Sequence, residues 1–327
     1  MKRGLIAWDR VELPEAVFAA RVERIRTRLT RSGLPGLVVF SDPWRSNPGR
    51  HLTNFMPYWG RSLLVVPASG APVLVCGLSS RVYPWLRTVT TLEDIRPAQQ
   101  LGQRLSQVVA DRGWSNVGVL DLPRLPQDIH RELTNGGLRV TDVSPELLGR
   151  WIDDSEIALR RLAAEMARRI LDTTIANTID RTDHQLAANL ERVFRLEGAE
   201  DVIVWIGDGA SMPRPPSGRP LGDRFCVTVA SERRGHWAML SRVKDPRASP
   251  AEVRARFERV IGNTASEAPE RLVIHDLSGS DSFRAIDPRL PLRSGSVLAL
   301  HVEHAEGSRL FHGDTCVATG PATVTLL

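Results

Sequence analysis

The spacing of hydrophobic positions changes along the chain between the period of a helix and the period of a strand. Apolar residues that recur every three or four positions predict helices, and short apolar or alternating runs predict strands. The predicted helices cover residues 15–32, 98–112, 126–134, 157–180, 183–196 and 249–263. The predicted strands cover residues 36–40, 61–66, 72–76, 116–122, 201–207, 271–275, 297–303 and 309–318. Because strands and helices alternate, the pattern predicts an α/β layer structure.

The segment 221–243 is predicted to form a β-hairpin. Two alternating runs, residues 225–230 and 236–243, flank a polar stretch of residues 231–235 that ends in glycine. Alternating runs on either side of a short polar turn are typical of a hairpin.

Period-2 alternation also predicts which side chains of this hairpin share a face. Thr228 lies on the face of Cys226, and Met239 lies on the face of Trp237 and Ser241. The hairpin therefore presents a hydroxyl, a thioether and an indole where a cleft can form.

Composition and charge narrow the function classes. The 327 residues predict two domains, each with its own core. The net charge of +5 comes almost entirely from arginine, and no arginine run is interleaved with aromatic residues, so we expect no nucleic-acid partner. Three unpaired cysteines, no signal peptide and no apolar run of membrane-spanning length indicate a cytoplasmic protein without a membrane partner.

Several motifs then resemble one family. Gly222-Asp223, Val227-Thr228-Val229, Gly235 and Ser241-Arg242-Val243 are similar to the metal-binding hairpin of the creatinase/aminopeptidase P/prolidase family, whose catalytic domain has the pita-bread fold. Asp314-Thr315-Cys316-Val317 resembles the family's last strand. The resemblance implies a small α/β N-terminal domain, residues 1–150, and a shortened pita-bread C-terminal domain, residues 151–327.

The N-terminal part carries its own resemblance. Residues 33–39 and 51–55 are similar to the "GLDALLV … YLTGF" pattern of the family's first domain. The family implies a homodimer in which the first domain lends residues to the neighbouring subunit's cleft. The candidates for that role are Arg45, Arg50, His51, Tyr58 and Trp59, with an ordinary surface loop as the alternative.

The expected metal chemistry is missing. The family's five ligands are carboxylates and one histidine, and by the resemblance their positions are Thr228, Met239, His275, His301 and Gly313. Hard dications need oxygen ligands, so we predict no bound metal and no other cofactor. One alternative stays open: His301 and Glu303 share a strand face, and with a further histidine they could bind zinc.

The residues that replaced the ligands suggest an acid–base site. His301 with Glu303 as its orienting carboxylate is the preferred catalytic pair, and His275 is a further acid–base candidate. Arg214 replaces a substrate-contacting histidine of the family and could bind a carboxylate. Thr228, Trp237 and Met239 are the remaining predicted substrate-binding residues, with structural roles as the alternative.

Two functions follow from these residues. The first is a metal-independent hydrolase, lyase or cyclase that acts on a small amino-acid-like or peptide-like substrate through His301 and Glu303. The second is a catalytically inactive pseudo-peptidase that binds a peptide or a partner protein through the former cleft. Convergence of His301, Glu303 and Arg214 on one cavity would favour the enzyme, and its absence would favour the binding protein.

Overall fold

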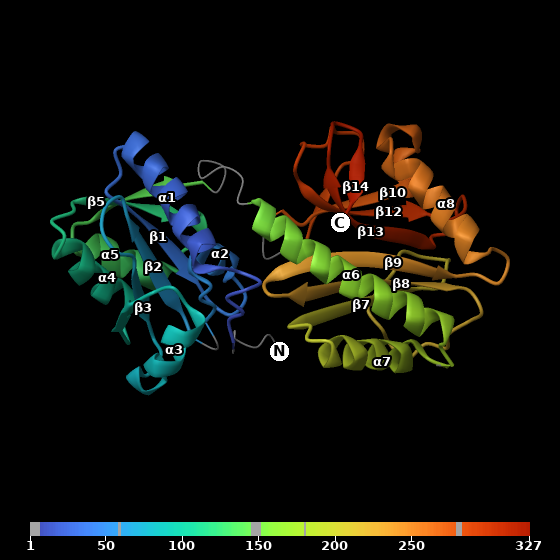
Figure 1. Cartoon of the computed structure of the whole chain (residues 1–327), viewed down its shortest axis with the longest axis horizontal. Coiled ribbons are helices and arrows are strands. Elements are labelled where there is room, and N and C mark those ends of the chain that lie inside the picture. Colours follow the sequence, from blue (N-terminus) through green and yellow to red (C-terminus); the bar gives the residue numbers. More distant parts are fainter. Residues whose placement is uncertain (1–6, 58–59, 145–151, 180, 279–282) are drawn as a thin grey trace. The chain divides into compact units, whose positions relative to one another are not determined.

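The chain divides into two compact units, residues 1–151 and 152–327, called here the first and the second unit (Figure 1). The computed structural model describes residues 7–57, 60–144, 152–179, 181–278 and 283–327. The expected domain boundary at residues 150 and 151 lies outside these ranges, as do the candidates Tyr58 and Trp59.

The first unit alternates strands and helices. Its elements are α1 (Glu15–Arg31), β1 (Gly36–Ser41), α2 (Asn47–Thr53), β2 (Ser62–Pro67), β3 (Val73–Cys76), α3 (Tyr83–Val89), β4 (Asp94–Pro97), α4 (Leu101–Ala110), β5 (Asn116–Leu120), α5 (Gln127–Asn135) and β6 (Arg139–Val143). Within the described residues the strands form one mixed sheet in the order β4-β3-β2-β1-β5-β6.

Apolar cores lie on both sides of this first sheet. Val22, Ile25 and Leu29 of α1 belong to one core, and α4 and α5 contribute to the other. The helical spacing of the α1 residues explains why this helix turns one apolar stripe to the sheet. The first unit is therefore a sheet with helices on both faces.

The second unit is built around a larger sheet. Its elements are α6 (Asp154–Ala176), α7 (Asp183–Leu196), β7 (Asp201–Gly207), β8 (Phe225–Arg233), β9 (His236–Lys244), α8 (Pro250–Ile261), β10 (Leu272–Asp276), β11 (Arg284–Ile286), β12 (Val297–Glu303), β13 (Phe311–Ala318) and β14 (Val324–Leu326). Among the described residues the strand order is β11-β10-β12-β13-β9-β8-β7, with β14 paired to β13, and the pairs are antiparallel.

Two helices begin at side-chain caps. Asp153 accepts a hydrogen bond from the backbone N–H of Glu156 at the start of α6. Thr182 and Gln185 form a reciprocal capping box that starts α7. Helix α6 then lies across β8 and β9 (Figure 1), and the apolar positions on its inner side join the core of this sheet.

The hairpin differs from its predicted form in one respect. Strand β8 extends to Arg233 and β9 begins at His236, so the predicted five-residue loop is wrong. Ser231 and Glu232 pair with residues of β9, and the turn consists of Arg234 and Gly235, which both have positive φ. A two-residue turn with positive φ at both positions matches the twist of the strands that it joins.

The elements absent from the sequence prediction are short. Helix α2 lies in the segment 41–60 and strand β11 lies in the segment 277–287, where the sequence pattern predicts neither a helix nor a strand. α3, β4, β6 and β14 were also not predicted. Three to seven residues give too few repeats of an apolar pattern to distinguish a helix or strand from a loop.

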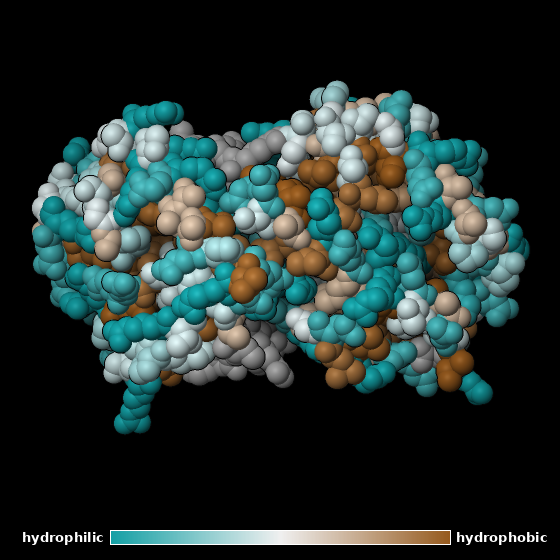
Figure 2. Space-filling view, in the orientation of Figure 1, coloured by the Kyte–Doolittle hydropathy of each residue, from teal (hydrophilic) through white to brown (hydrophobic). Residues whose placement is uncertain are grey.

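Hydrophilic and hydrophobic residues are interspersed over the visible face of each unit (Figure 2). Such mixing is ordinary for a globular surface, because polar groups alone do not cover it. Thr228, Ser241 and His301, discussed below, lie on the sheet face opposite α6 and are buried.

Candidate functional site

Two opposite faces of the second sheet carry different kinds of side chain. Arg242 of β9 binds Asp172 of α6, so it lies on the face that α6 covers. Ser241 precedes Arg242 and therefore points to the opposite face, called here the front face. The strand register places six predicted site residues on the front face: Thr228, Trp237, Met239, His275, His301 and Glu303.

A continuous hydrogen-bonded chain crosses the centre of the front face. The Thr228 Oγ1 and Ser241 Oγ atoms are 2.6 Å apart, and the Ser241 Oγ and His301 Nδ1 atoms are 2.8 Å apart. All three side chains are buried, and only 3% of His301 is exposed. Ser241 was not predicted as a site residue, although the alternation of β9 had placed it on the face of Met239.

Gly313 makes this chain possible. It lies between Ser241 of β9 and His301 of β12 in the strand register. A Cβ atom at this position would collide with Nδ1 of His301 and would lie 2.6 Å from the carbonyl oxygen of Leu300. The imidazole of His301 thus occupies the space that a side chain at residue 313 would need.

The environment of His301 keeps its imidazole neutral. Burial lowers the pKa of His301 to about 3, and the neighbouring His275, His312 and Arg242 act in the same direction. The His275 and His301 rings lie with their centroids 5.7 Å apart, and burial also lowers the pKa of His275. A neutral imidazole of this kind is a poor proton acceptor near pH 7.

Glu303 does not orient His301, contrary to the sequence-based expectation. Its carboxylate accepts hydrogen bonds from the backbone N–H groups of Gly307 and Arg309, at 3.2 and 2.9 Å. It is 3% exposed and closes the turn between β12 and β13. Strand alternation correctly placed His301 and Glu303 on one face. It could not show that backbone N–H groups of the turn would donate to the Glu303 carboxylate.

Arg214 also lies apart from the buried chain. Its side chain is 49% exposed, and its Nη2 atom donates to Asp208 Oδ2 at 3.2 Å. The backbone of Arg214 pairs with Ile206 of β7. Among the described residues, His301, Glu303 and Arg214 therefore bind separate partners, and these contacts do not bring them to one cavity.

Aromatic side chains cover the hairpin next to the polar chain. The Phe283 ring lies 5.1 Å from the Trp237 ring and 6.4 Å from the Trp205 ring, in edge-to-face arrangements. Trp205 pairs with Thr228 across β7 and β8, and Ala230 leaves space between the two tryptophans. Trp205 could have been found from the alternation of β7, whereas Phe283 follows a segment without a readable pattern.

Thr228, Trp237 and Met239 are buried instead of lining an open cleft. Met239 is tied to β13 through its backbone, because its N–H donates to Thr315 Oγ1 and its carbonyl accepts from the same hydroxyl. The structural alternative for these three predicted substrate-binding residues describes their positions better.

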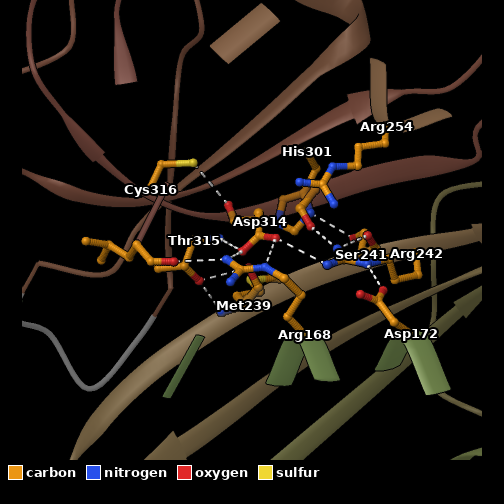
Figure 3. A network of polar contacts seen from close by, with 12 residues as sticks. Arg168, Asp172, Met239, Ser241, Arg242, Arg254, His301, Asp314, Thr315 and Cys316 are labelled. Atoms are coloured by element: carbon orange, nitrogen blue, oxygen red, sulfur yellow. Dashed lines mark hydrogen bonds and ion pairs between the residues drawn. The ribbon is translucent and has the colours of Figure 1, made fainter. Parts of the chain in front are cut away.

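An ionic network on the face that α6 covers joins β9 and β13 to this helix (Figure 3). Arg242 donates to Asp172 at 2.5 Å, to Asp314 at 3.2 Å and to the Gly313 carbonyl at 2.8 Å. Arg168 of α6 donates to both carboxylate oxygens of Asp314, at 2.9 and 3.0 Å. Asp314 thus anchors β13 to α6 and β9.

The residues that were candidates for a neighbouring subunit's cleft bind other residues of the first unit. The Arg45 guanidinium forms two hydrogen bonds to Asp42 and stacks on Phe40. Arg50 is buried and donates to the sulfur of Met56, and the His51 carbonyl accepts from Arg21. These contacts fix the segment within the first unit, and a role in a second subunit stays a prediction.

The residues at the family's ligand positions do not fit a pair of dications. Thr228, Met239 and Gly313 supply no carboxylate, and the His301 ring fills the space beside Gly313. In the described part of the chain, no group of three or more His, Cys, Asp or Glu side chains is placed to hold a metal ion. The alternative zinc site required Glu303 as a ligand, but both of its carboxylate oxygens accept hydrogen bonds from the turn between β12 and β13.

Comparison with solved structures identifies the fold. The X-Pro aminopeptidase of Thermotoga maritima MSB8 matches with a TM-score of 0.73 and 17% identity, over 94% of this chain and 98% of that one. The prolidase of Pyrococcus horikoshii OT3 matches with a TM-score of 0.70 and 13% identity, over 94% and 97%. The N-terminal domain of the FACT complex subunit SPT16 from Eremothecium gossypii matches with a TM-score of 0.60 and 14% identity, over 98% and 97%.

These similarities show that the chain has the pita-bread fold, preceded by the small α/β domain. No protein-family model and no curated protein matches the sequence. Of the helices in the described ranges, none is both long enough and apolar enough to cross a membrane.

Proposed function

We propose that this pita-bread protein binds a peptide-like ligand without cleaving it. The observation that carries the proposal is the closed hydrogen-bonded chain from Thr228 through Ser241 to His301. It occupies the positions where the resemblance would place catalytic metal ligands. A group that is buried and already paired on this face is poorly placed to meet a scissile bond.

The metal-independent enzyme has less support. General base catalysis near neutral pH needs a group with a pKa near the operating pH, and the pKa of His301 is lowered to about 3. The Nδ1 atom of His301 is bound to Ser241, and Glu303 is bound to a turn. Arg214, the intended carboxylate clamp, lies on an exposed loop with Asp208 as its partner.

The partly exposed aromatic edge of the front face is the proposed ligand surface. Trp205 and Phe283 are partly exposed next to the buried Trp237, and Ile203 on the same face of β7 is 37% exposed. Aromatic faces bind apolar rings such as that of proline through their large contact area. Several structures of the same fold are named for X-Pro peptides, which suggests the ligand class.

One of the matched structures of this fold is not named as a peptidase. The SPT16 domain is described as part of the FACT complex, so its fold is used within an assembly. Binding to an apolar segment of a partner protein is compatible with the proposed surface. The homodimer implied by the family is part of the same proposal, and sedimentation of the purified chain tests it.

Titration of tryptophan fluorescence with X-Pro dipeptides and tripeptides tests ligand binding, and mass spectrometry of the same mixtures tests cleavage. We expect saturable binding with intact peptide recovered, both with and without added Mn²⁺, Co²⁺ or Zn²⁺. Trp205→Ala should weaken binding by tenfold or more. Trp44→Ala removes a tryptophan that is 65% exposed in the first unit and is the matched control.

Each alternative result has a definite meaning. Cleaved product that increases with enzyme concentration would replace the binding protein with an enzyme. Equal affinity of the wild type and Trp205→Ala would place the ligand elsewhere. Absence of saturation with every peptide would reject a peptide-like ligand of this class.

A further inference from the structure

Strand β7 lies at one edge of the second sheet, and β8 is its one neighbouring strand among the described residues (Figure 1). In an antiparallel ladder, the backbone groups of successive residues point alternately toward and away from the neighbouring strand. Ile206 points away from β8, because its N–H and C=O exchange hydrogen bonds with Arg214 at 2.9 and 3.2 Å. By this alternation, the backbone groups of Val204 and Val202 also point away from β8.

Most of the outward backbone groups of these two valines are open. The Val202 N–H donates to Asp201 Oδ1 at 2.9 Å, so this donor is satisfied locally. Within the described residues, the Val202 C=O and both backbone groups of Val204 have no hydrogen-bond partner beyond the sheet. Both valines are partly exposed. A strand edge with open N–H and C=O groups is a template for another extended segment.

The segment of the chain that pairs with β7 ends before Val204. Arg214 faces Ile206 in an antiparallel register. Two positions further along, the residue that would face Val204 is Pro216. Proline has no N–H and cannot complete a hydrogen-bonded pair, and the next two N–H groups of the chain donate to Asp183 of α7 instead. The edge at Val204 is therefore left open.

We propose that an extended X-Pro peptide adds to β7 as an antiparallel strand, with residue X paired to Val204 and the proline opposite Ile203. This inference rests on the proposed binding of a peptide-like ligand and specifies how the ligand is held. Strand addition gives affinity through main-chain hydrogen bonds and selectivity through alternate side chains. Arg214 already occupies the place opposite Ile206, so the peptide has room for at most one residue before X.

Proline suits the second position of this register. A ligand residue opposite Ile203 has its N–H on the side away from β7, so the missing N–H of proline removes no hydrogen bond to this strand. The proline ring lies on the front face, where Ile203 is 37% exposed and Trp205 is partly exposed. Residue X precedes a proline and is therefore biased toward the extended backbone that strand addition requires.

N-methylated peptides test the register with the wild-type protein, and tryptophan fluorescence measures their affinities. Acetyl-Val-Ala-Val-amide and its form N-methylated at alanine should bind equally, because that N–H points away from β7. N-methylation of the first valine should weaken binding about tenfold, because its N–H donates to the Val204 C=O. Acetyl-Val-Pro-Val-amide should bind at least as tightly as the alanine peptide, because the proline ring adds apolar contact with the front face.

Val204→Pro removes the corresponding donor from the protein. The N–H of Val204 lies outside the β7–β8 ladder, so the strand should still form. Peptide affinity should fall about tenfold, while Val204→Thr, the matched control that retains the N–H, should bind within about twofold of the wild type. Urea unfolding of the three proteins checks the fold, and the N-methylated peptides decide the question if Val204→Pro is unstable.

The possible failures are distinguishable. Absence of binding by every peptide would overturn the peptide-like ligand itself. Binding that is equally sensitive or insensitive to the two N-methylations would overturn pairing with β7 while retaining a peptide ligand. A wild-type dimer in sedimentation that Val204→Pro dissociates would overturn the peptide as the occupant of this edge and replace it with a second copy of the chain.

Discussion

Gly313 and His301 form one packing unit at the residue scale. The imidazole of His301 leans across β13 toward Ser241 only because Gly313 has no side chain. From the sequence alone, His301 and Gly313 are two unrelated positions at which a family ligand is missing. The contact across the intervening strand explains why a histidine and a glycine occur together here.

Gly313→Ala should destabilise the protein by about 1–3 kcal/mol, because the new methyl group meets the backbone of residues 300 and 301 as well as the His301 ring. Chemical denaturation of the purified protein measures this change. Gly262→Ala is the control, since a Cβ atom there has no neighbour within 4 Å. Equal stabilities of the two variants would contradict the close packing around Gly313.

The free energy of unfolding should decrease as the pH falls, and protonation of His301 in the unfolded state is one reason. The pKa of His301 is about 3 when folded, and an unfolded histidine has a pKa of about 6.5. Between these values the unfolded state binds a proton that the folded state excludes. The contribution is therefore complete above about pH 6.5 and is lost toward pH 3, by about 1.4 kcal/mol per pH unit.

His301→Gln should reduce the dependence of the unfolding free energy on pH by about 1.4 kcal/mol per pH unit between pH 4 and pH 6. Urea unfolding at several pH values measures this dependence. His184→Gln, which removes an exposed histidine of α7, controls for the loss of a histidine elsewhere. A slope that His301→Gln leaves unchanged would show that the ring is solvated in the folded state.

At the element scale, β9 and β13 separate the two faces of the sheet into different roles. Ser241 and Gly313 belong to the front face, while the next residues, Arg242 and Asp314, form the ionic network with α6. Alternate positions of the same strands thus carry the hydrogen-bonded chain on one face and the ionic network on the other.

Asp314→Asn should lower the free energy of unfolding by about 3–5 kcal/mol, because it removes a buried carboxylate that pairs with both Arg242 and Arg168. Differential scanning calorimetry and denaturant titration measure the effect. Glu258→Gln breaks an exposed pair with Arg254 and should cost less than about 0.5 kcal/mol. A small effect of Asp314→Asn would mean that Asp172 compensates Arg242 by itself.

Sequence reasoning succeeded where the pattern is long and local. α7, β7 and β12 begin and end at the predicted residues, and the shared face of Trp237, Met239 and Ser241 follows from alternation. The contacts of the site could not be predicted in the same way. Ser241 and His301 are 60 positions apart, and the choice of Glu303 for a turn depends on backbone geometry.

At the scale of the whole molecule, each unit buries its own apolar cores. The cores of the first unit and those of the second share no residue. A unit of the size of residues 152–327 buries about 70% of the surface of its unfolded chain, which is enough for independent stability. The closed hydrogen-bonded chain therefore needs only elements of the second unit.

Residues 152–327 produced alone should therefore unfold in one cooperative transition, since one sheet joins all of the strands in this unit that the structure describes. Gly313→Ala should destabilise this fragment as much as it destabilises the full chain, because every atom near the new methyl group belongs to the second unit. Circular dichroism and denaturant titration of both lengths provide the comparison. A fragment that binds ANS and unfolds without a sharp transition would show that the first unit is required for the packing of the second.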